Sequence, residues 1–423
     1  MTPQDRLRVA IDARLRSGQA GGIETVVVGL ASGLGRLTDG DEEYLFLAYE
    51  GETSWLEPHL GGSSRILPVP TAGGGVDSLP ARVADRWPAL RRVWRLLPPS
   101  RLLPEPGPPR SDGTVEGTGA QVAHFPLQAG FLTELPSIYH PHDLQHVHLP
   151  GYFTPRERLH RESWYRALCE QARVVAVTSS WGRDDLVRHF DLPAEKVRVV
   201  PWAAVLDEYP TPTEEDLADV RARWDLDAPF LLYPAQTWPH KNHVGLLGAM
   251  ARLRDERGLL VRAVFPGRRN DRTRALDDVA TQLGLEGQVV WPGFVTGVQL
   301  ASLYRLARAV VIPTLFEAAS FPLWEAFQAG VPAACSNVTS LPEQAGDAAL
   351  VFDPRDERAI AAAIEQLWTD HELRLVLAIR GRQRVAAFTW ERTARTFRAL
   401  YRQCAGRRLT EDDAALLAAD PGI

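Results

Sequence analysis

The chain has 423 residues, of which 45% are hydrophobic and 24% charged, and these ordinary values exclude a wholly disordered chain or a collagen-like fibre. At roughly 100–200 residues per domain, this length predicts two or three domains. Acidic residues outnumber basic ones by 53 to 47, for a net charge of −6, which argues against a protein that binds nucleic acid.

The cysteines and the hydropathy pattern indicate in which cellular compartment the protein is expected. Cys169, Cys335 and Cys404 are odd in number, lie far apart and form no CxxC pair, so neither a disulfide framework nor a cysteine zinc site is expected. The first residues lack the apolar stretch of a secretory signal, and no apolar run reaches 18 residues. We therefore expect a cytoplasmic protein.

The first half of the chain alternates strands and helices. An apolar run at 8–11 ends at Asp12, a glycine cluster follows, and apolar positions then recur every three or four residues from 23 to 37, as on one face of a helix. Strand, glycine turn and helix begin a βα unit of a parallel sheet. Further strands are expected at 44–48, 121–125, 173–178 and 197–200. Residues 65–119, rich in glycine and proline, are expected to form an irregular surface excursion.

The second half repeats this alternation after an acidic stretch, 206–228, that we interpret as a linker. Strands are expected at 230–234, 259–265, 288–291, 309–313 and 331–335, and a terminal helix at 390–404. The predicted fold class is α/β, with an N-terminal domain at 1–205, a C-terminal domain at 229–389, and a helix and tail at 390–423 that pack back on the first domain. Ligands bind beyond the carboxyl ends of strands in such doubly wound sheets, so the site is expected in a cleft between the domains.

The stretch from 313 to 354 carries the strongest motif. It holds Glu317 and Glu325 around a strand-to-helix turn, and it resembles the C-terminal signature of retaining glycosyltransferases of family 4, which have the GT-B architecture of two Rossmann-like domains facing across a cleft. The resemblance continues, in the family's order, through the glycine loop after IDAR, 139–166, 233–243, 291–295 and 303–307, and covers nearly the whole chain apart from 65–119.

The resemblance implies a site for a nucleotide diphosphate sugar. Without a metal, two phosphates require cationic side chains and helix N-termini, and Lys241 matches the family's cation. Glu325 would bind the ribose hydroxyls and Glu317 the hydroxyls of the donor sugar. The implied donor-binding residues are Gly21, Gly22, Gln236, Lys241, Arg268, Phe294, Val295, Glu317, Ala318, Ala319, Ser320, Phe321 and Glu325. The plainer alternatives are a surface lysine, carboxylates that complement a helix dipole, a hydrophobic strand end at 294–295 and a tight glycine turn.

On the N-terminal side, His142 matches the family's active-site histidine, which makes His142, Lys241 and Glu317 the implied catalytic residues. Asp143 beside it is expected to orient the imidazole or to contact the acceptor. His124 is a second candidate for the acceptor side, with a structural histidine as the alternative. His140, His142, His146 and His148 also allow a metal interpretation, but we expect no metal site, since two prolines lie in this loop and no second ligand cluster accompanies it.

The chain departs from the family pattern at two places. The turn after Glu317 is usually Gly-Phe-Gly but is Ala318-Ala319-Ser320 here, and side chains crowd any position that needs a positive φ. Gln236 replaces a common arginine, so Arg268 or Arg269 is expected to supply the missing cation. The Gln236 version resembles members that act in bacterial polysaccharide assembly, often with mannose donors. An Asp-Leu-Asp at 225–227 mimics a metal motif but falls in the predicted linker.

The predicted function is that of a retaining, metal-independent hexosyltransferase that uses a nucleotide diphosphate sugar, a hydroxyl acceptor and no cofactor. A non-catalytic nucleotide-sugar-binding subunit, or another GT-B enzyme such as an epimerase or a phosphorylase, is the alternative. The stretch 81–102 holds six arginines and two tryptophans and could form a basic amphipathic helix. Packing on the N-terminal domain is the favoured interpretation of this helix, and contact with the inner face of a membrane remains open.

Overall fold

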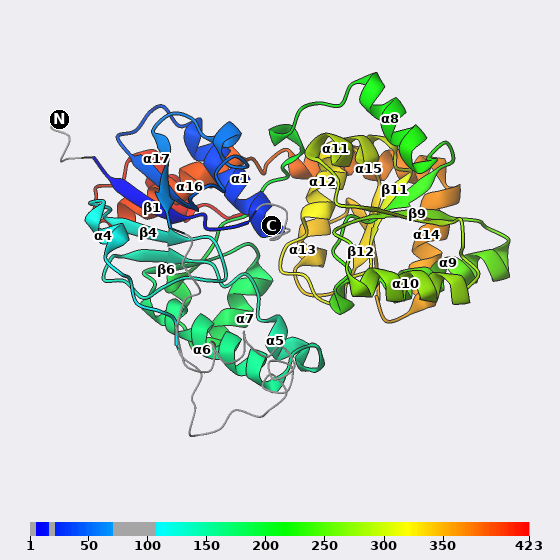
Figure 1. The fold of residues 1–423 in the computed structure, drawn as a ribbon, viewed down its shortest axis with the longest axis horizontal. Helices are drawn as coiled ribbons and strands as arrows, with labels where there is room; N and C mark the ends of the chain where they lie inside the picture. Colours follow the sequence, from blue (N-terminus) through cyan, green and yellow to red (C-terminus); the bar gives the residue numbers. More distant parts are fainter. Residues whose placement is uncertain (1–5, 17–21, 71–106, 423) are drawn as a thin grey trace. The chain divides into compact units, whose positions relative to one another are not determined.

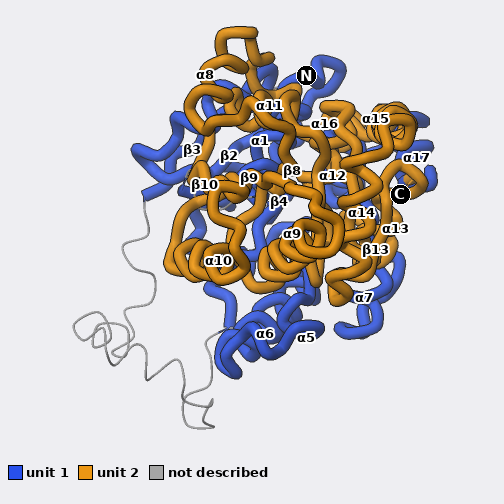
Figure 2. The backbone as a smooth tube through the Cα atoms, turned by 90° about the vertical axis from the view of Figure 1, so that its right-hand side faces the viewer, with its two compact units in different colours: residues 1–177, 183–200, 394–421 blue, residues 178–182, 201–393, 422–423 orange. Residues whose placement is uncertain are grey.

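The structure is a computed structural model that describes residues 6–16, 22–70 and 107–422. It divides into two compact units. Unit 1 comprises residues 1–177, 183–200 and 394–421, and unit 2 comprises residues 178–182, 201–393 and 422–423. Figure 2 colours the two units, and each is described by itself below.

Unit 1 is built on a seven-stranded, fully parallel sheet in the order β3-β2-β1-β4-β5-β6-β7. The strands are β1 (Arg8–Asp12), β2 (Glu43–Tyr49), β3 (Ser64–Val69), β4 (Val122–Phe125), β5 (Ser137–Tyr139), β6 (Val174–Val177) and β7 (Val197–Val199). The strand order reverses between β1 and β4, where Val9 pairs with Tyr44 on one side and with Val122 on the other. This reversal is the point at which doubly wound sheets bind ligands.

Helices flank this sheet, and its inner strands β1, β2, β4, β5 and β6 are almost wholly buried because a parallel sheet is covered on both faces. They are α1 (Gly22–Gly35), α4 (Thr114–Gly117), α5 (Gln145–His148), α6 (Pro155–Gln171), α7 (Ser180–Phe190), α16 (Trp390–Cys404) and α17 (Glu411–Ala418), with short 3₁₀ helices η2 (Glu57–His59), η3 (Pro150–Tyr152) and η4 (Ala194–Lys196). Figure 1 shows the red helices α16 and α17 beside the blue start of the chain. The terminal helix predicted at 390–404 is confirmed.

Unit 2 contains a six-stranded parallel sheet in the order β10-β9-β8-β11-β12-β13. Its strands are β8 (Phe230–Leu232), β9 (Arg262–Pro266), β10 (Val289–Gly293), β11 (Ala309–Ile312), β12 (Ala333–Ser336) and β13 (Ala349–Phe352). The strand order reverses between β8 and β11. These two strands are neighbours although residues 233–308 lie between them, so the loops that follow them meet at one edge.

Helices cover both faces of the second sheet, as Figure 1 shows. They are α8 (Glu214–Trp224), α9 (His243–Arg257), α10 (Asp271–Gln282), α11 (Gly297–Leu306), α12 (Phe321–Ala329), α13 (Leu341–Ala345), α14 (Glu357–Thr369) and α15 (His371–Val385), with η5 (Leu206–Glu208) and η6 (Pro239–Lys241). One continuous hydrophobic core joins this sheet to its helices. The predicted α/β class, with two Rossmann-like units, is confirmed.

The structure differs from the sequence expectations in three places. The excursion expected at 65–119 carries the edge strand β3, which pairs only with β2 among the described strands, and Pro68 is tolerated at such an edge. The linker expected at 206–228 holds α8, which begins with a capping box at Thr213 and packs on α11. The strands β5 and β13 were not predicted, since runs of three and four residues give little periodic signal.

The possible amphipathic helix at 81–102 lies outside the described residues. Among the helices that the structure describes, none combines the length and the apolar character needed to cross a membrane.

Candidate functional site

The loops after β8 and β11 bring Lys241 and Glu317 together. The Lys241 Nζ lies 2.5 Å from the Glu317 Oε2, and both side chains are mostly buried, with 18% and 15% exposed. The residues are 76 apart in sequence and meet because β8 and β11 are neighbours at the reversal of the strand order. Two of the three predicted catalytic residues therefore form a charged pair at the edge of the sheet where ligands bind.

Main-chain contacts fix the position of Lys241. It ends the 3₁₀ turn η6, and Asn242 then adopts a left-handed backbone with φ 55° before α9 begins. The Asn242 side chain donates to the Pro354 carbonyl at 2.8 Å, and the Tyr233 hydroxyl donates to the Lys241 carbonyl at 3.1 Å. The Leu315 amide donates to the His240 carbonyl at 2.7 Å, which ties the two loops to each other. The lysine thus belongs to a built turn rather than to a free surface loop.

The turn after Glu317 is equally well held. The hydroxyls of Thr339 and Ser340 both donate to the Glu317 carbonyl. The Gln344 side chain makes two hydrogen bonds to the main chain of Ser320. Its oxygen accepts from the Ser320 amide at 2.9 Å, and its nitrogen donates to the Ser320 carbonyl at 2.7 Å. Gln344 is a support residue that the sequence analysis missed, since no motif links it to a position 24 residues earlier.

The Ala318-Ala319-Ser320 turn needs no glycine. None of the three residues has a positive φ, and Ser320 itself lies in the extended region at φ −104°, where a side chain causes no strain. The expected crowding is therefore absent from this turn. Phe321 begins α12 and stacks on Trp202 at 5.3 Å between ring centroids.

Glu325 lies in α12 and is buried in a hydrophobic surrounding. Its Oε2 accepts a hydrogen bond of 2.7 Å from the hydroxyl of Tyr304, a buried residue of α11 that the sequence analysis also missed. Burial raises the pKa of Glu325 to about 7, because it disfavours the charged carboxylate more than the tyrosine hydrogen bond favours it. Glu325 is a carboxyl group close to its titration point at neutral pH.

The remaining predicted donor residues follow β8, β9 and β10. Gln236 is half-buried in the loop after β8, and Arg268 is exposed after β9. Arg269 donates to the Trp291 carbonyl, so it serves the fold of this loop. Phe294 is 63% exposed directly after β10, whereas Val295 packs against the core of unit 2.

In unit 1, Gly22 is exposed at the start of α1, and Gly21 lies outside the described residues. The end of β1 before this loop carries an ion pair that the sequence analysis missed. Asp12 is almost fully buried and accepts two hydrogen bonds from the Arg14 guanidinium, at 2.8 and 2.7 Å. The pairing with Asp12 raises the pKa of Arg14, so this guanidinium stays charged.

His142 lies in a strained loop after β5. Its φ of 64° falls in the left-handed region, a conformation that costs a non-glycine residue of order 1–3 kcal/mol and that is concentrated at functional sites. The Nε2 of His142 is 2.8 Å from the Pro126 carbonyl, so Nε2 carries the proton of the neutral ring. Burial lowers the pKa of His142, and the ring is neutral at pH 7. Asp143 accepts from the Gln145 amide at 3.0 Å, two residues before α5 begins.

His124 lies in the core, which favours the structural alternative for this residue. Its Nδ1 is 2.6 Å from the Tyr401 hydroxyl of α16, and its Nε2 is 2.8 Å from the Nε2 of His140. Burial lowers the pKa of His124 to about 3 and that of His140 far below its usual value, so both imidazoles are neutral. With both ring nitrogens engaged inside the core, His124 has no contact to offer an acceptor.

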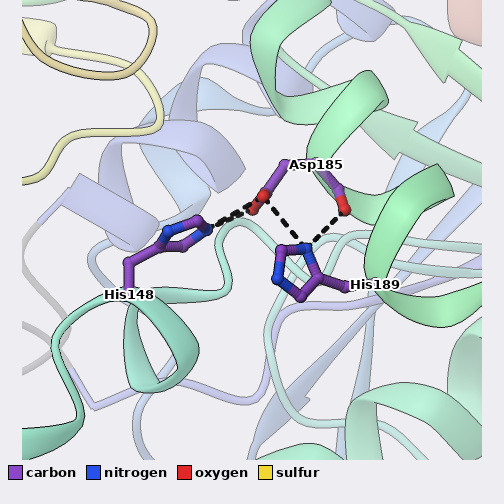
Figure 3. Close-up of side chains that lie close together, drawn as sticks. All are labelled: His148, Asp185 and His189. Atoms are coloured by element: carbon purple, nitrogen blue, oxygen red, sulfur yellow. Dashed lines mark hydrogen bonds and ion pairs between the residues drawn. The ribbon is translucent and has the colours of Figure 1, made fainter.

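The metal expectation needs one correction. We expected no second ligand group beside the histidine-rich loop, but α7 places Asp185 and His189 next to His148, and Figure 3 shows both imidazole rings directed at the Asp185 side chain. His146 pairs with Glu162 at 3.3 Å instead.

Known protein families and relatives match this chain over most of its length. Residues 21–203 match the glycosyl transferase 4-like domain, and residues 215–384 match the glycosyl transferases group 1. O-antigen chain mannosyltransferase B of Escherichia coli is 32% identical over 266 residues, which are 60% of this chain and 70% of that relative. The serotype-specific mannosyltransferase WbdA of Escherichia coli is 28% identical over 55% of this chain, but the match spans only 29% of its length.

A solved structure shows the same architecture. Sucrose-phosphate synthase from Thermosynechococcus elongatus superimposes with a TM-score of 0.67 at 21% identity, covering 94% of this chain and 99% of that one. At this identity the likeness concerns the fold alone. With both family models and the mannosyltransferase match, the chain belongs to the group 1, family 4-like glycosyltransferases of GT-B architecture.

Proposed function

We propose that the protein transfers a hexose, mannose foremost, from a nucleotide diphosphate sugar to a hydroxyl acceptor, with retention of the anomeric configuration and without a metal ion. The observation that carries the proposal is the pair of Lys241 and Glu317 at the reversal of the strand order in unit 2. Mannose and a polysaccharide acceptor are inferred from the names of the two mannosyltransferase relatives.

The charged pair supports a site for a diphosphate. Lys241 is one of only two lysines in the chain, the other being Lys196. An ammonium group that is paired with a carboxylate 2.5 Å away can exchange this partner for a phosphate oxygen, which carries more charge and accepts charge-assisted hydrogen bonds. Glu317 is then released to accept hydrogen bonds from sugar hydroxyls, as expected of it. Donor binding therefore rearranges a preformed pair and leaves neither charge buried alone.

Glu325 is proposed to bind the ribose. A carboxylate accepts two hydroxyl hydrogen bonds well, and each one favours the ionised form. Because the pKa of Glu325 is raised to about 7, bound nucleotide stabilises its carboxylate and releases a proton in the fraction of molecules in which it was protonated.

The chemical step needs no enzyme nucleophile in this proposal. The bond between the anomeric carbon and the phosphate oxygen breaks, and the acceptor oxygen forms its bond on the same face of the sugar. The acceptor's proton passes to the departing phosphate. Negative charge grows on that phosphate, and Lys241 together with the main-chain amides at Gly22 is proposed to stabilise it.

Unit 1 is proposed to supply His142 and Asp143 for the sugar and the acceptor. The neutral ring of His142 holds its proton on Nε2 through the Pro126 carbonyl, which fixes the tautomer and the orientation of the imidazole. His142 can accept a hydrogen bond through Nδ1 in this state, and it carries no charge that would compete for the phosphates.

The decisive experiment measures sugar transfer and acceptor-free donor hydrolysis in excess EDTA. A thermal-shift screen with GDP, UDP, ADP and TDP first identifies the nucleotide, since a ligand at 100 times its Kd stabilises the folded protein by about 2.7 kcal/mol. We expect both activities to continue in EDTA and the anomeric NMR signals to show retention. Complete loss in EDTA with recovery on adding magnesium or manganese contradicts the metal-independent donor site, and an inverted product contradicts the same-face substitution.

A further inference from the structure

We propose that His148, Asp185 and His189 of unit 1 form a binding site for a divalent transition-metal ion such as Zn²⁺. Two imidazoles and one carboxylate are a ligand set that suits zinc and its neighbours. None of the three residues belongs to the proposed donor site, so this inference is independent of the proposed function.

The local helices explain why these side chains meet. Asp185 and His189 are four residues apart in α7, so they lie on one face of the helix. His148 ends the short helix α5, which approaches this face from a separate part of the chain. The three residues thus come from two elements, and an ion bound between them would join α5 to α7.

The distances fit a coordination sphere. His148 Nε2 lies 2.9 Å from both carboxylate oxygens of Asp185, and His189 Nδ1 lies 3.2 Å from Oδ1. All three ligand atoms lie within 4.8 Å of one another. Ligand bonds of about 2.0–2.2 Å place the corners of a tetrahedron roughly 3.3–3.6 Å apart, so little movement is needed to admit an ion.

The three side chains differ in burial, which favours a firmly held carboxylate ligand and an ion that solvent can reach. Asp185 is 5% exposed, whereas the side chains of His148 and His189 are about one third exposed, at 31% and 29%. The carboxylate is therefore held by the fold, and solvent can reach the imidazoles and a fourth position. Three protein ligands with one open position describe an exchangeable site rather than a closed structural one.

Metal binding has a defined proton requirement. His148 Nε2 is hydrogen-bonded to the Asp185 carboxylate, whereas the hydrogen bond of His189 Nδ1 goes to the Asp185 main-chain carbonyl at 3.0 Å and Oδ1 lies 3.2 Å away. Each coordinating nitrogen must be unprotonated, so a neutral ring moves its proton to the other nitrogen and an imidazolium loses one. Metal affinity is therefore expected to depend on pH.

The test is a cobalt titration of the full-length, tag-free protein after removal of bound metal. Co²⁺ should bind one equivalent and give the visible absorption of a low-coordinate site, and Zn²⁺ should displace it. Asp185→Asn, His148→Ala and His189→Ala should each weaken binding by roughly tenfold or more, since even residues behind the ligands contribute 10–100-fold to metal affinity. His371→Ala, which removes an exposed histidine outside the site, is the matched control and should bind normally.

A second readout measures the link between the helices. Zn²⁺ should raise the thermal midpoint of the parent protein and of His371→Ala but leave that of His148→Ala unchanged. His148 is exposed, so its replacement should leave the fold intact. The inference is overturned if no saturable one-to-one uptake occurs, or if His148→Ala and His189→Ala take up cobalt like the parent. In that case the three residues are only a hydrogen-bonded network.

Discussion

In unit 2 the strands at the reversal of the sheet order are followed by a lysine and a glutamate in a charged pair. In unit 1, β1 at the reversal ends in the Asp12–Arg14 ion pair, and its neighbour β4 carries His124, a neutral histidine in the core. Both sheets are parallel and doubly wound, so the architecture alone does not decide the chemistry at the strand ends. The difference lies in what the loops carry and how deeply they bury it. Mostly buried charges that keep some exposure can exchange partners with a charged ligand, while fully buried neutral rings fix the geometry of what lies next to them.

The charged half of this comparison is tested first by Lys241→Ala. The substitution removes a charge-assisted contact to phosphate, worth about 1.5–3 kcal/mol, so kcat/KM should fall roughly ten- to over a hundredfold with the fold retained. Steady-state kinetics and a denaturation curve check both statements.

The chain supplies a matched control because it has only one other lysine. Lys196 donates to the Glu170 carbonyl in unit 1, and Lys196→Ala should leave kcat/KM within about twofold. With an amine-reactive reagent, the nucleotide should protect Lys241 and leave Lys196 labelled. Equal labelling of Lys241 with and without nucleotide would remove it from the donor site.

The neutral half is tested by Tyr401→Phe. This change removes a hydroxyl that is 2.6 Å from His124 Nδ1 and leaves a buried ring nitrogen without that partner, which should cost about 1–3 kcal/mol of unfolding free energy. Urea unfolding measures this loss. Tyr152→Phe, at an exposed tyrosine, should change the curve little. An unchanged curve for Tyr401→Phe means that the histidine network contributes little to stability.

A pH series tests Glu325. If only ionised Glu325 binds the ribose, affinity for the nucleotide sugar should rise about tenfold from pH 6 to pH 8, because a group with a pKa near 7 becomes ionised over this range. The affinity should rise, not fall, with pH. Hydroxyl groups of the ribose donate hydrogen bonds to the ionised carboxylate of Glu325, which burial alone disfavours. Isothermal titration across this range measures it. Glu325→Gln should bind more weakly and lose the pH dependence, and a parent profile as flat as that of Glu325→Gln contradicts the ribose assignment.

The smallest effect is expected from Ala318→Gly and Ser320→Gly, which place glycine at the two positions where the family pattern has it. Neither position has a positive φ, so glycine relieves no strain there and KM for the donor should stay within about twofold. A gain well above this range means that the turn adopts a different backbone when the donor is bound.

The sequence predicted much of the fold because periodicity and glycine turns mark most strands and helices, and ordered motifs predicted Lys241, Glu317 and Glu325. It could not predict which distant residues hold them. Gln344 on Ser320 and Tyr304 on Glu325 are contacts across 24 and 21 residues that leave no local pattern. The sequence also did not predict that His124 is buried, because its partner Tyr401 lies in α16, 277 residues further along the chain.

The helix α16 has a consequence for anyone who wishes to dissect this protein. Its first residues stay with unit 2, where Trp390 donates to the Ala204 carbonyl and Thr393 to the Pro201 carbonyl, while Phe397 and Tyr401 pack against His124 in unit 1. A fragment that stops before residue 390 therefore lacks part of the hydrophobic interior of its own N-terminal half. No single cut in the gene yields two self-sufficient halves, and a soluble N-terminal fragment would require residues 394–421 to be supplied in trans or spliced back on.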